Sequence, residues 1–153
     1  MTTPDYDTDF YAWTQTQAAA IRAKDLARLD IVHLAEEIES LGIADEHAIT
    51  HQLERLLHHL LKWRYQPTHR SPSWRRSIDQ ARRRIEDRIQ RSPSLGPYPA
   101  QRLPLAYRRA RRDASLETGF PLATFPEACE WSIAQVLDED FLPEGPQEGL
   151  PRG

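Results

Sequence analysis

Apolar residues along the chain recur with the period of an α-helix, most densely between Ile49 and Pro67. Within this stretch they follow one another at steps of four and three, which places them on one helix face. They are Ile49, Leu53, Leu56, Leu60 and Trp63. The pattern predicts a central helix from about residue 44 to residue 65, and Pro67 ends it because proline cannot continue a helix.

Five other segments have helical spacing or a helix-start signal. We predict helices over residues 9–24, 30–41, 72–90 and 100–118, and a short last helix over residues 132–138. Ser71 followed by Pro72 is a typical N-cap and first-turn pair, and Ser132 has the spacing of a capping box with Gln135. No segment alternates apolar and polar residues over the length of a strand. The pattern therefore predicts an all-α fold, a helical bundle of about five main helices plus a short C-terminal helix.

Gly42 lies between the second predicted helix and the central one, and glycine often follows the last residue of a helix. We therefore expect one helix to end and the next to start there, so that the two pack as an antiparallel pair. The second helix would then bury its apolar face, which consists of Ile31, Leu34, Ala35, Ile38 and Leu41. Pro104 leaves two alternatives for the helix over residues 100–118, which either begins at this proline or is kinked by it.

The chain has 153 residues, of which 39% are hydrophobic and 28% are charged, as in ordinary soluble globular proteins. This length suits a single domain, which we place at residues 1–142. Residues 143–153 are rich in proline and glycine, and we expect this tail to be disordered. The acidic start of the chain does not resemble a signal peptide, and the single cysteine, Cys129, suits a reducing compartment. We expect a cytoplasmic protein with no membrane span.

The net charge of −3 conceals an uneven distribution of charge. From Lys62 to Arg112 there are 15 basic and 3 acidic residues, whereas the segments on either side are acidic. A basic segment favours contacts with the phosphates of nucleic acid. The candidate basic patch consists of Arg75, Arg76, Arg83, Arg84, Arg108 and Arg109. The alternative is that these arginines pair with acidic helices of the same bundle.

Several ionisable side chains project toward the core side of their predicted helices, where an unpaired charge is costly. They form a candidate polar cluster of Glu37, His59, Tyr107 and Arg111, with Arg82 placed similarly. One interpretation is a hydrogen-bonded network that fixes how the helices meet. The other is a site for a small anion or for acid–base chemistry, in which Glu37 and His59 share a proton.

Other candidates for chemistry are weaker. His47, His51, Glu54 and His58 follow one stripe of the central helix. The stripe lies opposite the apolar face, so we expect it to be solvated rather than to bind a metal. Cys129 has acidic neighbours, which would raise its pKa and make it a poor nucleophile. We predict no metal, no cofactor and no catalytic residue.

Short motifs along the chain resemble those of the family called domain of unknown function 29. They are DFYAW (residues 9–13), LAEEIESLG (34–42), HLLKWRYQP (59–67), SPSWRRSI (71–78), SPSL (92–95), AYRRAR (106–111), TGFPLATFPEAC (118–129) and DEDFLP (138–143). They follow the same order as in the family and cover nearly the whole chain except the tail. The resemblance implies a small bacterial all-α protein and supplies no activity, substrate or cofactor.

We therefore expect a non-enzymatic module that binds another macromolecule, with a protein as the first choice of partner. A nucleic-acid-associated protein that uses the arginine-rich helices over residues 72–90 and 100–118 is one alternative. A small enzyme or anion-binding protein centred on the polar cluster is the other. The oligomeric state does not follow from the sequence.

Overall fold

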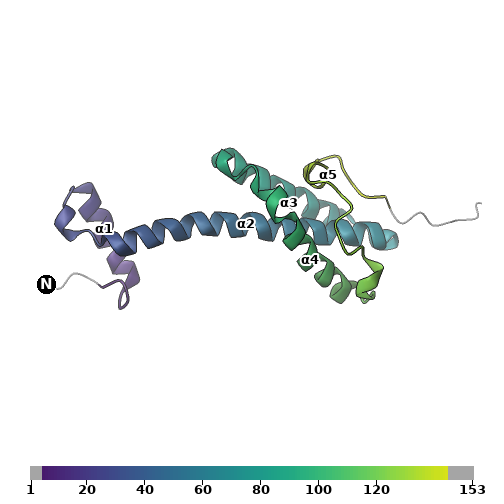
Figure 1. Ribbon diagram of the computed structural model, residues 1–153, viewed down its shortest axis with the longest axis horizontal. Helices are drawn as coiled ribbons and strands as arrows, with labels where there is room; N and C mark the ends of the chain where they lie inside the picture. Colours follow the sequence, from purple (N-terminus) through teal and green to yellow (C-terminus); the bar gives the residue numbers. More distant parts are fainter. Residues whose placement is uncertain (1–4, 145–153) are drawn as a thin grey trace, which may run out of the picture. The chain divides into compact units, whose positions relative to one another are not determined.

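The computed structural model describes residues 5–144, and every regular element in this range is helical. The α-helices are α1 (Phe10–Arg22), α2 (Ile31–Tyr65), α3 (Pro72–Arg91), α4 (Tyr98–Thr118) and α5 (Ile133–Leu137) (Figure 1). Single turns of 3₁₀-helix form η1 (Leu26–Arg28), η2 (Pro67–His69), η3 (Pro93–Leu95) and η4 (Leu122–Thr124). The all-α prediction is confirmed. Among the described residues, no helix has both the length and the apolar composition of a membrane span.

The chain divides into two compact units, unit 1 (Met1–Ala44) and unit 2 (Asp45–Gly153). Unit 1 contains α1, η1 and the first part of α2, and unit 2 contains the rest of α2 with all later elements. The single domain over residues 1–142 stays a prediction, because two compact units can still fold together. Residues 145–153 of the expected disordered tail lie outside the described residues.

α2 runs through Gly42 without interruption, so the prediction of two helices that pack as an antiparallel pair is wrong (Figure 1). Gly42 does not have the positive φ that ends a helix, unlike Gly119, whose φ of 76° follows the last residue of α4. A glycine inside a helix costs about 1 kcal/mol relative to alanine. A helix of 35 residues tolerates this cost.

In unit 1, the predicted apolar face of α2 is not buried. Ile31 and Ile38 are each 67% exposed, and Leu41 is 71% exposed. The segment that leads into α1 contacts another side of α2, where Tyr6 stacks on His33. The polar side of this helix is therefore engaged within unit 1, and its apolar side faces solvent.

The core of unit 2 forms around the second part of α2, as the central-helix pattern predicts. This part of α2 buries a run of leucines against α3 and α4, and one residue each from the later loop and α5 completes the core. The members with no exposed surface are Leu53, Leu56, Leu57, Leu60, Ile78, Ala81, Ala106, Ala110, Ala114 and Val136. Burying one leucine side chain contributes about 1.5–3 kcal/mol, so this cluster is the main source of stability in unit 2.

The two helix-start signals predicted at Ser71 and Ser132 are confirmed. The side chain of Ser71 accepts a hydrogen bond from the backbone N of Trp74 at 3.2 Å. Ser132 and Gln135 form the expected capping box at the start of α5. α4 begins at Tyr98 and continues through Pro104, so this helix does not start at that proline.

Candidate functional sites

Two members of the predicted polar cluster, Tyr107 and Arg111, lie one turn apart on α4 and bind the same loop. The Tyr107 hydroxyl donates to the carbonyl of Pro126 at 2.6 Å. The Nε and Nη2 atoms of Arg111 donate to the carbonyl of Phe125 at 3.1 and 3.0 Å. Burial raises the pKa of Tyr107 to about 12, so its hydroxyl is protonated at neutral pH and remains a donor. Both side chains attach this loop to α4.

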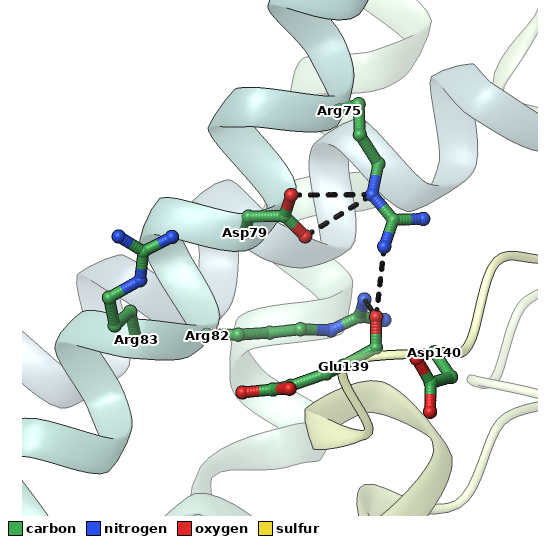
Figure 2. Close-up of a pocket in the computed structure, with 6 residues that line it drawn as sticks. All are labelled: Arg75, Asp79, Arg82, Arg83, Glu139 and Asp140. Atoms are coloured by element: carbon green, nitrogen blue, oxygen red, sulfur yellow. Dashed lines mark hydrogen bonds and ion pairs between the residues drawn. The ribbon is translucent and has the colours of Figure 1, made fainter.

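Arg82 on α3 attaches the segment around α5 in a similar way, through backbone carbonyls. It is 4% exposed and donates to the carbonyls of Val136 (2.9 Å), Phe141 (2.7 Å) and Glu139 (3.4 Å). Figure 2 shows that Arg75 also reaches the Glu139 carbonyl. Burial lowers the pKa of Arg82, but a guanidinium remains charged at any physiological pH. Its hydrogen bonds go to backbone carbonyls, and the nearby charges of Asp79, Asp138 and Asp140 oppose part of the effect of burial on its pKa.

The remaining two members of the cluster have local partners. The Nδ1 atom of His59 lies 2.8 Å from the carbonyl of Arg55 in the preceding turn, and burial lowers the pKa of His59. Glu37 belongs to unit 1 and accepts a hydrogen bond from the Tyr6 hydroxyl. Among the described residues, no hydrogen bond joins any two of the five predicted members. The hypothesis that Glu37 and His59 share a proton therefore has no support in these contacts.

The six arginines of the candidate basic patch differ in their surroundings. Arg75 pairs with Asp79, and the Nη1 atom of Arg109 lies 2.8 Å from Glu54. The other four are exposed and have no ion pair with any residue in the range 5–144. They are Arg76, Arg83, Arg84 and Arg108. Two of the six arginines therefore pair with acidic residues and four remain open to solvent, and contacts with nucleic acid stay a prediction.

A charge cluster that the sequence analysis did not predict joins α2 to α4. Lys62 is 5% exposed, and its Nζ atom lies 2.7 Å from one oxygen of Glu117 and 4.5 Å from the centre of the Trp74 ring. The Nε2 atom of His58, one turn earlier on α2, lies 2.5 Å from the other oxygen of Glu117. One carboxylate on α4 thus contacts two side chains on neighbouring turns of α2.

Protonation of this cluster follows from its surroundings. Burial lowers the pKa of His58, and the nearby Glu117 opposes this only in part. Burial would raise the pKa of Glu117, but the hydrogen bond from Lys62 and the nearby histidine lower it. A neutral imidazole therefore lies beside a charged lysine–glutamate pair at pH 7. A neutral imidazole at this distance from a carboxylate places its N–H toward the oxygen, so His58 is a donor to Glu117.

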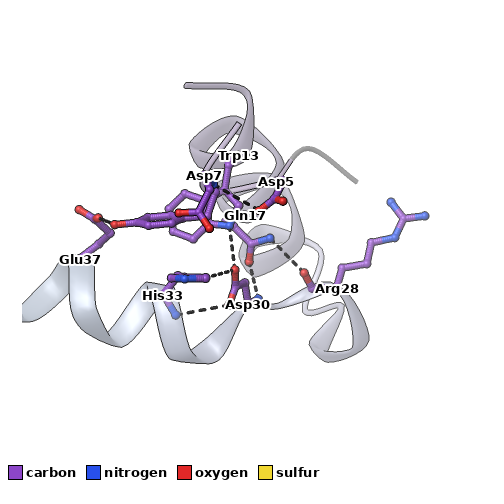
Figure 3. Close-up of polar contacts among 9 residues, drawn as sticks. Asp5, Asp7, Trp13, Gln17, Arg28, Asp30, His33 and Glu37 are labelled. Atoms are coloured by element: carbon purple, nitrogen blue, oxygen red, sulfur yellow. Dashed lines mark hydrogen bonds and ion pairs between the residues drawn. The ribbon is translucent and has the colours of Figure 1, made fainter. Parts of the chain in front are cut away.

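In unit 1, a network of hydrogen bonds surrounds Asp30, which caps the start of α2 (Figure 3). Its carboxylate accepts from the Trp13 Nε1 atom at 3.1 Å and lies 2.6 Å from the His33 Nδ1 atom. The Gln17 side chain accepts from the backbone N of Asp30 at 2.8 Å and donates to a carbonyl of η1 at 3.1 Å. The Asp30–His33 hydrogen bond lowers the pKa of the aspartate and raises that of the histidine. These contacts fix α1 against the first turn of α2.

The histidine stripe contributes no metal centre in the described part of the chain. His47 and His51 are exposed, whereas His58 contacts Glu117. No group of three or more histidine, cysteine, aspartate or glutamate side chains within residues 5–144 is arranged to hold a metal ion. Cys129 is half-buried, and burial raises the pKa of its thiol.

Comparison with known proteins gives one match. A family model described as Domain of unknown function DUF29 matches residues 6–142, which agrees with the motifs found in the sequence. No curated protein and no solved structure matches the chain. The match therefore identifies the family, and it indicates no biochemical activity.

Proposed function

Because this chain belongs to the family of domain of unknown function DUF29, which brings no activity with it, we propose a function from the chain's own geometry. We propose a non-enzymatic interaction module that binds another protein through the apolar face of α2 in unit 1. The observation that carries this proposal is the exposure of Ile31, Ile38 and Leu41 on one side of a well-formed helix.

These side chains form one stripe. They are spaced by seven and three residues, and the half-buried Leu34 lies between them. Exposed apolar side chains that gather on one face mark interaction sites more often than isolated ones do. Each isoleucine or leucine would contribute about 1.5–3 kcal/mol on full burial, so a partner that covers the stripe gains substantial free energy.

The charges beside the stripe favour a basic partner over a second copy of this chain. Residues 31–44 include Glu36, Glu37 and Glu39, and they include no lysine or arginine. Two copies joined through this face would bring like charges together, which opposes pairing. An amphipathic helix with lysine or arginine beside its apolar face would match both the stripe and its charge.

Site-specific photocrosslinking in the native cell tests this function. We would replace Ile38 with p-benzoylphenylalanine and use Ser40 as the matched control, because Ser40 is exposed on the opposite side of the same helix. We expect a crosslinked adduct with another protein from position 38 only. The substitution Leu41→Glu should remove this adduct, since it places a charge in the contact.

Equal crosslinking from positions 38 and 40, or an adduct that persists in Leu41→Glu, would contradict the proposal. An adduct of two copies of the chain would overturn the choice of a basic partner and reassign the face to self-association. Circular dichroism of each variant shows whether α2 is still formed.

The other two functions have less support. The exposed Arg76, Arg83, Arg84 and Arg108 favour a nucleic-acid-associated protein, but pairing of Arg75 and Arg109 removes part of that patch. An enzyme would need its acid–base residues to lie together beside a substrate cavity, whereas no hydrogen bond among the described residues joins any two members of the polar cluster. A cytoplasmic location remains our proposal, supported by the single cysteine.

A further inference from the structure

A cavity of about 430 Å³ in unit 2 is lined by residues of α2 and α3. Its lining consists of Gln52, Arg84, Asp87, Arg88 and Arg91. The three arginines are spaced by four and three residues, so they project from one face of α3 into the same space. Arg84, Asp87 and Arg91 are exposed, so the cavity is open to solvent and a ligand can enter it.

The arginines that line this cavity have few acidic partners for their N–H donors among the described residues. Arg88 and Arg91 share one acceptor, the Oδ1 atom of Asp45, at 2.5 and 3.5 Å. Arg84 has no ion pair with any residue that the structure describes. Together with Asp45 and Asp87, the cavity carries three positive and two negative charges and thus a net positive charge.

The neutral residue of the lining also lacks a partner. The Oε1 atom of Gln52 is buried and makes no hydrogen bond among the described residues. A buried acceptor without a donor is unfavourable by about 1–3 kcal/mol. Rotation of this amide toward the cavity would let a hydroxyl or amine of a ligand donate to it.

We propose that this cavity binds the phosphate group of a phosphorylated ligand, with Arg84 and Arg91 as its main donors and Arg88 held in place by Asp45. The planar fork of a guanidinium matches two phosphate oxygens at once, which a lysine cannot do. The phosphate could belong to a free nucleotide or to the backbone of a nucleic acid, because both present the same oxygens. This site rests on different residues from the apolar face of α2.

Binding of defined phosphate compounds tests the site and separates the two sources. ATP and inorganic pyrophosphate would be titrated by calorimetry, and a fluorescein-labelled 20-nucleotide single strand and its duplex by anisotropy, all at 50 mM salt. The test variant is Arg84→Gln/Arg91→Gln. The matched control is Arg22→Gln/Arg112→Gln, which removes two exposed arginines that lie outside both the cavity lining and the candidate basic patch.

We expect the test variant to weaken binding at least tenfold and the control to weaken it less than twofold. The side-chain amide signal of Gln52 in ¹H–¹⁵N spectra should shift with ATP or an oligonucleotide in the wild type and in the control, and it should not shift in the test variant. Loss of ATP and pyrophosphate binding assigns a small-molecule ligand, whereas loss confined to the oligonucleotides assigns a nucleic-acid backbone.

Three results would overturn the site. One is the absence of binding by all four probes. Another is binding that both double variants weaken equally, since that describes a diffuse arginine surface. The third is binding of ATP or an oligonucleotide without a change at Gln52. Thermal unfolding of each variant, followed by circular dichroism, verifies that loss of binding is not loss of fold.

Discussion

At the scale of single residues, Glu117 matters more than its position near the surface suggests. Its carboxylate is the only acidic partner of the buried Lys62 among the described residues. The substitution Glu117→Gln would leave the lysine ammonium with Trp74 and a neutral amide. We expect the free energy of unfolding to fall by about 1–3 kcal/mol, measured by urea denaturation. The control Glu127→Gln, at an exposed position with no ion pair in the described chain, should change it by less than about 0.5 kcal/mol.

The pKa values of three histidines should depart from the ordinary value of 6.5 in opposite directions, upward for His33 and downward for His58 and His59. The hydrogen bond to Asp30 raises the pKa of His33, so its stabilising contribution is present at low pH and is lost as pH rises through the raised value. Burial lowers the pKa of His58 and His59, so their contribution is present above pH 6.5 and is lost as pH falls through the lowered values. NMR titration of the ring protons tests this. A His33 that titrates below His59 would contradict it.

The contacts of Glu117 with His58 and Lys62 could not be predicted from the sequence. The spacing of His58 and Lys62 places them on one side of α2, but Glu117 lies 55 positions beyond Lys62. No local pattern connects residues that far apart. Tyr107 and Arg111 were found because they lie on the inward side of α4, yet their partners are backbone carbonyls, which carry no signal in the sequence.

At the scale of elements, the backbone conformation of a glycine decides whether a helix ends there, and its position in the sequence does not. Helical periodicity identified every α-helix to within about two residues, and it failed only where Gly42 was given the role of a helix end. Gly119 has that role instead, because it adopts the left-handed conformation that other residues avoid. Sequence alone cannot show which of two glycines has a positive φ.

Substitution of the two glycines makes the difference measurable. A Cβ atom at Gly42 would meet nothing within 4 Å, so Gly42→Ala should stabilise the protein by about 0.5–1 kcal/mol. Gly119→Ala should destabilise it by about 1 kcal/mol, because alanine is strained at a φ of 76°. Thermal unfolding followed by circular dichroism compares the two variants. A loss of stability in Gly42→Ala would show that α2 is not regular at this position.

At the scale of the whole molecule, the two units have different kinds of interior. Unit 2 holds the continuous apolar core, whereas unit 1 relies on Trp13, Gln17 and Ala20 with the hydrogen bonds around Asp30. The apolar periodicity of residues 30–41 suggested burial there as well. Periodicity reports that one side of a helix is apolar, and it does not report what covers that side.

A fragment of residues 45–144 should therefore fold by itself. We expect one cooperative thermal transition and dispersed amide signals, because every member of the core cluster lies within the fragment. Leu57→Asp in the same fragment is the negative control, since it places a charge at a fully buried position. A fragment without a cooperative transition would mean that unit 2 needs unit 1 in order to fold.

The way in which the segment after α4 is attached has a consequence for the substitutions that it can tolerate. Arg82, Arg111 and Tyr107 bind this segment through its carbonyls, and every amino acid supplies a carbonyl. Substitutions at exposed positions such as Glu139 leave those acceptors in place. The outer side chains of this segment should therefore tolerate substitution without release of the segment, provided that the three donors are retained.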